Sequence, residues 1–237
     1  MYFNSIRNAN IDIDGSGNID LMKNLTAKAK ISDALINNAG YYQTVEVIDG
    51  ERPDHLSKRL YNTEQYHWTF LLLNPQIKNI WDDWPMKYSQ LVEYCTNKYQ
   101  YLVADTDADL NNKFILNETV TGGISSATGK IKEIHVNMGY VVIEKTSGTF
   151  TVTGETIFGV DSQDSVACNF IKSQAYAPHH HIDDSTEAWV PRRAAGTTAF
   201  TYIDYESAVT EQNRKLKVIK PEHISGVARQ FINVMGV

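Results

Sequence analysis

The sequence contains little cysteine and no cysteine pattern that could build a scaffold. Its 237 residues include only Cys95 and Cys168, which lie far apart in the chain. A small secreted domain held together by disulfides needs more cysteines at closer spacing, so that class of protein is excluded. We expect both residues to be reduced structural thiols.

Long apolar runs are also missing. The longest, Phe70 to Leu73, is far too short to cross a bilayer, and residues 1–14 lack the continuous apolar core of a secretory signal. The sequence therefore predicts no membrane contact, and a protein that is made and kept in a cytoplasm.

Basic charge is scarce as well. The formal net charge is -6 and the isoelectric point is near 5.6, whereas a nucleic-acid surface needs Lys and Arg gathered on one face. The nearest such group is interpreted as the solvated edge of a helix, and it consists of Arg214, Lys215, Lys217 and Lys220. We expect no nucleic-acid partner.

The motifs that could support catalysis or cofactor binding are incomplete. Gly122-Gly123 lacks the lysine and the following helix of a phosphate-binding loop. In an extended segment His179 and His181 share a face and, with Asp183, would form half of a zinc site. No further ligand follows at metal-site spacing, and His181 has no evident nucleophile beside it. We expect no enzyme activity, no cofactor and no metal.

A polar stretch near the N-terminus partly follows the calcium loop of an EF-hand. Asp12, Asp14, Ser16 and Gly17 fall on its ligand and turn positions, but Lys23 stands where a bidentate glutamate is required. No helix signal precedes Asp12. The stretch is interpreted as a polar turn without calcium.

Strand and helix signals alternate from Tyr41 to Asn74. Residues 41–48 are rich in Val and Tyr and end at the turn dipeptide Asp49-Gly50, which predicts a strand. Pro53 suits the first turn of a helix that runs to Tyr61. Thr63 is a candidate N-cap for a second, apolar helix over residues 66–73.

This order of strand, turn, short helix and apolar helix resembles the LysM module. The matching positions are Val45, Val47, Gly50, Asp54, Leu56, Leu60, Tyr61, Leu71, Leu72 and Asn74. The closing strand of such a module is expected within residues 76–81, where it is poorly marked. LysM modules hold peptidoglycan or chitin in a shallow groove, so the resemblance implies either glycan binding or a scaffold reused for protein contacts.

The remainder of the chain changes texture twice. Residues 82–103 predict a helix, and residues 111–173 carry β-branched runs between glycines, which is typical of a small antiparallel barrel or sandwich. Within them Glu118 to Gly122 and Glu155 to Gly159 echo one another. Residues 185–198 are interpreted as a polar bridge before two C-terminal helices, one from Ile203 through the lysines near 217 and one opened by Pro221.

We therefore predict the α+β class, with four regions in chain order. They are an N-terminal arm and short helix (1–40), a LysM-like unit with a following helix (41–103), an inserted β-rich domain (104–176), and a linker with C-terminal helices that return to the LysM-like unit (177–237).

Two blocks of the chain resemble a family of baseplate wedge proteins from T-even-type contractile-tailed phages, the small wedge component with a LysM-like unit. The first block is residues 51–74, and the second is residues 202–235. The β-rich middle is not part of the resemblance. Membership of this family implies a structural virion protein of the tail baseplate, assembled in the host cytoplasm and bound to wedge and hub proteins in a sixfold assembly.

The residues that we expect to bind such partners are mainly aromatic, because aromatic side chains are frequent anchors in protein interfaces. They are Arg52, Pro53, Tyr61, Tyr66, Trp68, Asn74, Trp81, Trp84, Tyr205 and Phe231. Two alternatives stay open: a peptidoglycan-binding LysM module of a tail or lytic protein, and a metal-dependent hydrolase built on His179, His181 and Asp183.

Overall fold

The computed structural model describes residues 7–12, 15–24, 40–190 and 193–236. The predicted mixture of helices and sheets is confirmed, since this part of the chain holds five α-helices and four antiparallel sheets. The chain divides into two compact units: unit 1 contains Met1–Lys87 and Thr210–Val237, and unit 2 contains Tyr88–Val209.

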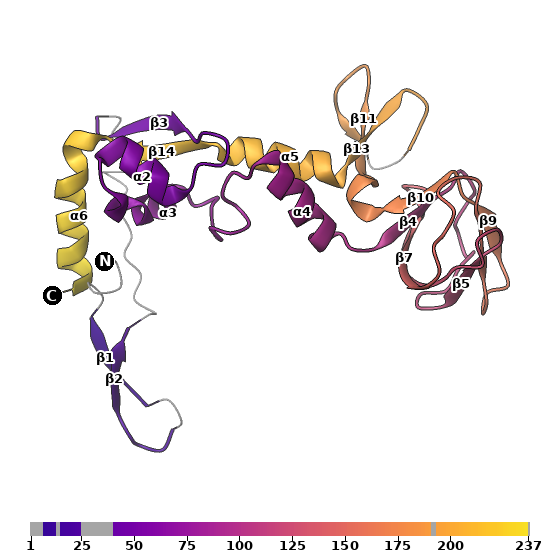
Figure 1. Cartoon of the computed structure of the whole chain (residues 1–237), viewed down its shortest axis with the longest axis horizontal. Coiled ribbons are helices and arrows are strands. Elements are labelled where there is room, and N and C mark those ends of the chain that lie inside the picture. The colour runs from indigo at the N-terminus through magenta and orange to yellow at the C-terminus, as the bar shows by residue number, and fades with distance from the viewer. Residues whose placement is uncertain (1–6, 13–14, 25–39, 191–192, 237) are drawn as a thin grey trace. The chain divides into compact units, whose positions relative to one another are not determined.

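Unit 1 is built on a two-stranded sheet with helices packed against it (Figure 1). Strand β3 (Tyr42–Glu46) runs antiparallel to β14 (Lys215–Ile219). Between them in sequence come α2 (Pro53–Tyr61), the 3-10 turn η2 (Glu64–Tyr66) and α3 (Trp68–Leu73), and α6 (Pro221–Gly236) follows β14. The core of unit 1 joins these elements through Leu56, Phe70, Ile77, Trp84, Leu216 and Val218.

Local signals explain where the first two helices of unit 1 begin and end. Pro53 occupies the first turn of α2, and Asn62 ends that helix in the left-handed conformation at φ 58°. The single helix predicted over residues 66–73 is divided, because the Thr63 side chain accepts a hydrogen bond from Gln65 N and caps a separate 3-10 turn.

The closing strand predicted within residues 76–81 is wrong. Those residues form turns, and the partner of β3 is Lys215–Ile219, which had been predicted as the end of a helix and an apolar step. Leu216 and Val218 are fully buried and alternate with Lys215, which is exposed, and Lys217, which is half-buried, so this segment fits a strand with one buried face. Helix α5 (Tyr202–Asn213) therefore ends before the lysines.

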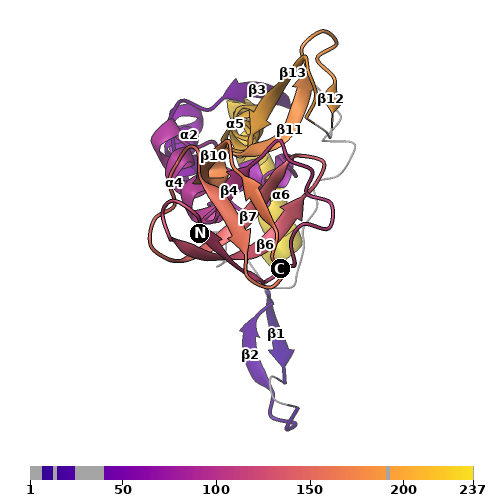
Figure 2. The same ribbon diagram turned by 90° about the vertical axis from the view of Figure 1, so that its right-hand side faces the viewer.

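Unit 2 contains a seven-stranded antiparallel sheet that curls into a half-barrel. Its strands are, in chain order, β4 (Leu102–Asp105), β5 (Thr119–Gly122), β6 (Thr128–His135), β7 (Tyr140–Ser147), β8 (Thr156–Gly159), β9 (Ser165–Ala167) and β10 (Phe170–Ser173). Figure 2 looks onto β10, β4, β7 and β6 side by side. The edge strands β9 and β10 do not pair with each other, so the sheet is not a closed barrel.

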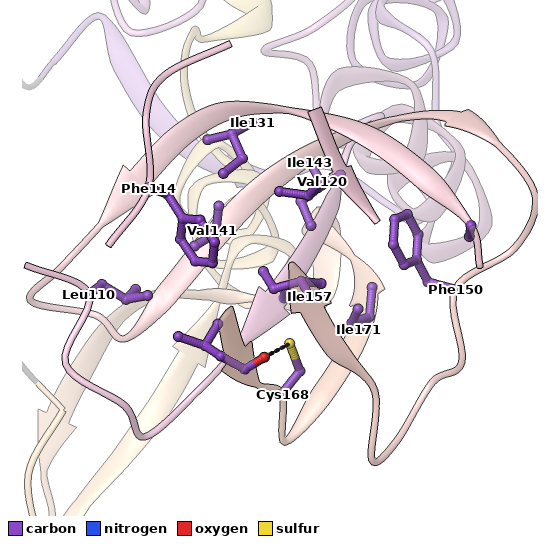
Figure 3. Close-up of a cluster of buried hydrophobic side chains, with 13 residues drawn as sticks. Leu110, Phe114, Val120, Ile131, Val141, Ile143, Phe150, Ile157, Cys168 and Ile171 are labelled. Carbon is purple, nitrogen blue, oxygen red and sulfur yellow. Dashed lines mark hydrogen bonds between the residues drawn. The ribbon is translucent and has the colours of Figure 1, made fainter. Parts of the chain in front are cut away.

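The concave side of this sheet holds the core of unit 2. Figure 3 shows its apolar side chains, among them Phe114, Ile143 and Ile157, together with Cys168. Two register shifts in the pairing of β6 with β7 add the local twist that a curled sheet needs. Both cysteines are free and buried, as expected for structural thiols.

The helix predicted over residues 82–103 is shorter than expected. Helix α4 covers Tyr88–Lys98, and Leu102–Asp105 forms β4 of the sheet instead. Pro85 precedes the helix, and the residue before a proline avoids the helical conformation. Val103 and Ala104 are buried in the sheet, which explains why the apolar run does not continue as a helix.

The sequence echo in unit 2 is a structural pair. Strands β5 and β8 are antiparallel neighbours, with Val120 opposite Gly159. The Glu118 carboxylate accepts hydrogen bonds from Asp161 N and Ser162 N in the turn after β8. The Glu155 carboxylate accepts from Ile124 N and Ser125 N in the turn after β5. Each buried glutamate thus caps the turn that belongs to the other copy.

The polar bridge predicted over residues 185–198 is instead part of a three-stranded antiparallel sheet. Strand β11 (Pro178–Asp183) lies between β12 (Trp189–Val190) and β13 (Thr197–Thr201). Asp183 holds the turn after β11, because its Oδ1 accepts hydrogen bonds from Ser185 and Thr186 through both backbone and side chain. The polar residues here form a tight turn between paired strands.

The described residues of the N-terminal region form a hairpin. Strand β1 (Asn8–Ile11) pairs with β2 (Asp20–Lys23), and Gly17 N donates to Asp12 Oδ2 at 2.9 Å in the connecting turn. Asp14 and the short helix predicted within residues 1–40 lie outside the described residues. No helix in the described part of the chain is long and apolar enough to span a bilayer.

Candidate partner-binding surface

The ten predicted partner-binding residues separate by burial. Asn74, Trp84 and Phe231 are buried, at 3%, 7% and 9% exposed, whereas Trp81 is 83% exposed. Tyr61, Tyr66 and Trp68 are half-buried, as is Pro53. Arg52 and Tyr205 are exposed. Nine of them belong to unit 1, and Tyr205 belongs to unit 2.

Asn74 is a structural clamp and not a contact residue. Its Nδ2 donates to the carbonyl oxygens of Phe70 and Lys217, at 2.8 and 2.9 Å, and its Oδ1 accepts from Lys217 N at 2.9 Å. The side chain therefore ends α3 and holds β14 in register at once. Both amide hydrogens are used within the chain, and the side chain is buried, so it offers no donor to a partner.

Most of the aromatic candidates are also held inside unit 1. The Trp84 indole N-H donates to the carbonyl of Glu51 at 2.7 Å, and the Tyr61 hydroxyl donates to the carbonyl of Ile219 at 2.8 Å. The rings of Trp68 and Phe231 lie 4.5 Å apart and join α3 to α6. These residues were predicted as partner anchors, and their contacts make them part of the packing of unit 1.

Trp81 is the exception, because it lies on a braced loop and faces solvent. Asp83 Oδ2 accepts from Lys78 N and Asn79 N, both at 2.8 Å, and Trp81 N donates to Asn79 Oδ1 at 3.0 Å. The carbonyl of Asp83 accepts from Asn213 Nδ2 at 2.9 Å, which ties the loop to the end of α5 within unit 1. A rigid loop that exposes a large aromatic ring is suited to fill a pocket on another protein.

The start of α2 offers charged groups but weak anchoring. Arg52 Nε lies 3.2 Å from Asp54 Oδ1, and the Arg52 side chain is 73% exposed. An exposed ion pair of this kind contributes little to stability, so Arg52 can exchange its partner at low cost. Pro53 serves the helix start, as predicted from its position.

The ion pair between Arg59 and Glu51, close to the start of α2, was not predicted from the sequence. The Arg59 guanidinium makes a two-pronged contact with Glu51, with Nε and Nη2 each 2.7 Å from a carboxylate oxygen. Burial opposes ionisation of Glu51, but hydrogen bonds from Arg59 and from Ile48 N hold its pKa below the usual value. The pair fixes the segment after β3. No spacing signal identifies it, because the partners come from a loop and the last turns of α2.

Tyr205 of unit 2 belongs to an aromatic and histidine cluster. Its ring stacks on His179 at 4.3 Å with an interplanar angle of 16°, while His180 packs near Phe200 and Trp189. The expectation that His179 and His181 share a face is wrong, because a register shift between Pro178 and His180 interrupts the alternation of β11. His179 Nδ1 instead lies 2.9 Å from His180 Nδ1.

The histidines and cysteines of the described residues were compared with what a metal ion or a reactive thiol needs. The described residues contain no group of three His, Cys, Asp or Glu side chains that could hold a metal ion. Burial lowers the pKa of His179, His180 and His181, and it raises the pKa of Cys95 and Cys168 to about 11. Thiols of that kind are poor nucleophiles at neutral pH.

Neither a protein-family model nor a curated protein sequence matches the chain.

Proposed function

We propose that this chain is a structural component of the tail baseplate wedge of a contractile-tailed phage, in which unit 1 is a LysM-like scaffold that binds neighbouring wedge and hub proteins. The observation that carries the proposal is how the two resemblance blocks fold. Residues 51–74 supply α2 and α3, and residues 210–235 of the second block supply the end of α5, β14 and most of α6, so both blocks contribute to one core. The first residues of the second block, 202–209, belong to unit 2. Distant blocks with a shared resemblance are expected to form one unit if they were retained together.

The order of elements supports the LysM-like reading of unit 1. Strand β3, helices α2 and α3, and strand β14 form an arrangement of strand, helix, helix and antiparallel strand. The residues that match the module contribute to the core of unit 1, among them Val47, Leu56 and Leu60. Under this reading the whole of unit 2 is inserted before the closing strand.

Trp81 is the anchor through which we expect this unit to hold a neighbour. It combines a large apolar surface with a loop that loses little freedom on binding, and both properties concentrate binding free energy in a few residues. Glycan binding by unit 1 is the competing function, and it predicts retention on peptidoglycan without any protein partner.

The test is co-assembly with tail proteins encoded beside the gene for this chain. We expect the purified chain to co-sediment with one or more of them, and Trp81→Ala to weaken the complex by roughly 2 kcal/mol. The matched control is Trp189→Ala, which removes another exposed indole, 61% accessible, from unit 2. Absence of co-sedimentation by the intact chain, together with its retention on peptidoglycan, would reject the wedge assignment in favour of wall binding.

A further inference from the structure

Unit 2 contains a cavity of about 250 Å³ beside the edge of its seven-stranded sheet. Asp105 of β4, Lys172 of β10 and His181 of β11 line it, and Arg193 and Tyr176 lie at its exposed side. The volume is just below the roughly 300 Å³ at which small-molecule pockets usually begin. The cavity therefore has room for a small organic group.

His181 is the first sign that the cavity is built for a ligand. The residue is 3% exposed, and its Nδ1 is a buried side-chain atom without a hydrogen-bond partner in the described part of the chain. Leaving such a group unpaired carries a desolvation cost of about 1–3 kcal/mol. The His181 ring also lines the cavity, so its pKa should respond to a charge bound there.

Two cations with spare bonding capacity line the same cavity. Lys172 Nζ lies 4.1 Å from the centre of the Phe170 ring, and among the described residues it has no ion-pair partner. Burial lowers the pKa of Lys172, so a bound anion would stabilise its charged form. Arg193 contacts Asp105 and Asp107 only through Nη1, which leaves the Nη2 and Nε side of its planar fork for a further acceptor.

The carboxylate that lines the cavity, Asp105, already accepts hydrogen bonds within the chain. Asp105 is 2% exposed, and its Oδ2 accepts from Asn169 Nδ2 and Arg193 Nη1, both at 3.0 Å. Asp105 and Asp107 both pair with Arg193, so Lys172 is the cation without a salt bridge among the described residues. One satisfied carboxylate and one imidazole are too few ligands for a metal ion, so the polar groups favour a single negative charge.

We propose that this cavity binds a small carboxylate carried on an apolar group. The planar carboxylate matches the free side of the Arg193 fork, Lys172 supplies the opposing charge, and the His181 ring lines the same space. The apolar part of the ligand packs against Phe170 and Pro178, which also line the cavity. This site is independent of the proposed wedge function, because none of its residues belongs to unit 1.

The experiment is a titration of the full-length chain with butyrate, with the histidines isotope-labelled. The readout is the imidazole NMR signals of His181. Butyrate is expected to shift these signals saturably and to raise the His181 pKa, because the carboxylate stabilises the protonated ring. Butyramide has nearly the same size and no charge, so it should leave the signals unchanged. Lys172→Met should weaken butyrate binding by about tenfold or more.

The matched control is Lys130→Met, which removes an exposed lysine of β6 outside the cavity and should bind butyrate like the parent chain. Three results would overturn the proposal: no saturable shift with butyrate, equal shifts with butyrate and butyramide, or tighter binding of inorganic phosphate than of butyrate. The comparison of butyrate with butyramide uses the unchanged chain, so it decides the question even if a variant does not fold.

Discussion

Unit 1 joins residues from the two ends of the described chain, whereas unit 2 folds largely from neighbouring segments. In unit 1 the hydrogen bond from Tyr61 to Ile219 spans 158 positions, and strand β3 pairs with the distant strand β14. In unit 2 the pairs β5 with β6, β6 with β7 and β8 with β9 are hairpins between consecutive strands, although β4 pairs with β7 and β10, and β5 with β8. Closing a long loop costs more conformational entropy than closing a short one, so the stability of unit 1 depends more heavily on each contact of its last strand.

The two units also satisfy buried polar groups differently. Unit 1 uses a neutral amide, Asn74, to bind two backbone segments. Unit 2 uses two ionised carboxylates, Glu118 and Glu155, each of which accepts several N-H groups from a turn. Hydrogen bonds to charged groups are the stronger kind, and they also make stability depend on pH. The stability of unit 1 therefore depends most on one strand, and the stability of unit 2 depends most on its buried carboxylates.

The largest effect is expected from Leu216→Ala in β14. Leu216 is fully buried among Leu56 and Phe70, and such a truncation costs about 2–5 kcal/mol. Hydrogen exchange should show loss of amide protection in β3 and α2 while β7 stays protected. The exposed neighbour Lys215 provides the control, and Lys215→Ala should change neither region. Equal loss of protection in β7 would contradict the separation of the two units.

A smaller effect is expected from Asn74→Ala. The substitution leaves Lys217 N without its acceptor and the Phe70 carbonyl without one donor, at a cost of about 1–3 kcal/mol. Thermal unfolding should report the loss, and exchange should speed up first in β14. Gln76→Ala, in the exposed turn that follows, is the control. Unchanged exchange in β14 would show that the clamp does not hold the strand.

An effect of about the same size is expected from Glu155→Gln and Glu118→Gln, which test whether the two copies in unit 2 are equivalent. Each variant places an amide N-H₂ against backbone donors, and we expect a loss of about 1.5–3 kcal/mol for each. The control is Glu133→Gln, because the Glu133 side chain is 53% exposed. A loss confined to one of the two variants would mean that only one turn needs its cap.

The same pair predicts acid sensitivity in unit 2. Burial opposes ionisation of Glu155, but hydrogen bonds from Ser125 and from backbone N-H groups hold its pKa at about 2. A carboxyl whose folded pKa is depressed stabilises the fold above its unfolded value, and that contribution is lost as pH falls from about 5 to about 2. The free energy of unfolding should depend less steeply on pH across this range in Glu155→Gln than in the parent chain.

Local signals allowed much of the fold to be predicted. Pro53, Asn74 and Pro221 mark helix ends correctly, because proline and the residue before it restrict the backbone whatever surrounds them. The β-rich texture of residues 111–173 and its internal echo were also visible, since short strands between glycines need no tertiary information to be recognised.

The segments that the sequence misassigned are those whose partners are distant. The residues of Lys215–Ile219 fit a helix end as well as a strand, and only the pairing with β3 decides between them. The polar residues within Pro178–Thr201 suggest a linker, and only the pairing of β11 with β12 and β13 identifies them as strands and turns. The burial of the predicted partner-binding residues was not visible in the sequence for a related reason. Trp81 and Trp84 differ by three positions in one loop, yet only packing distinguishes the exposed ring from the buried one.

The sequence by itself determined the mixed fold class and several helix ends of unit 1, because these follow from backbone chemistry and residue types. The tertiary structure decided which strand closes unit 1, which tryptophan is exposed, and which histidine faces a cavity with two cations. Those features depend on contacts between residues far apart in the chain, and a linear pattern carries no record of such contacts.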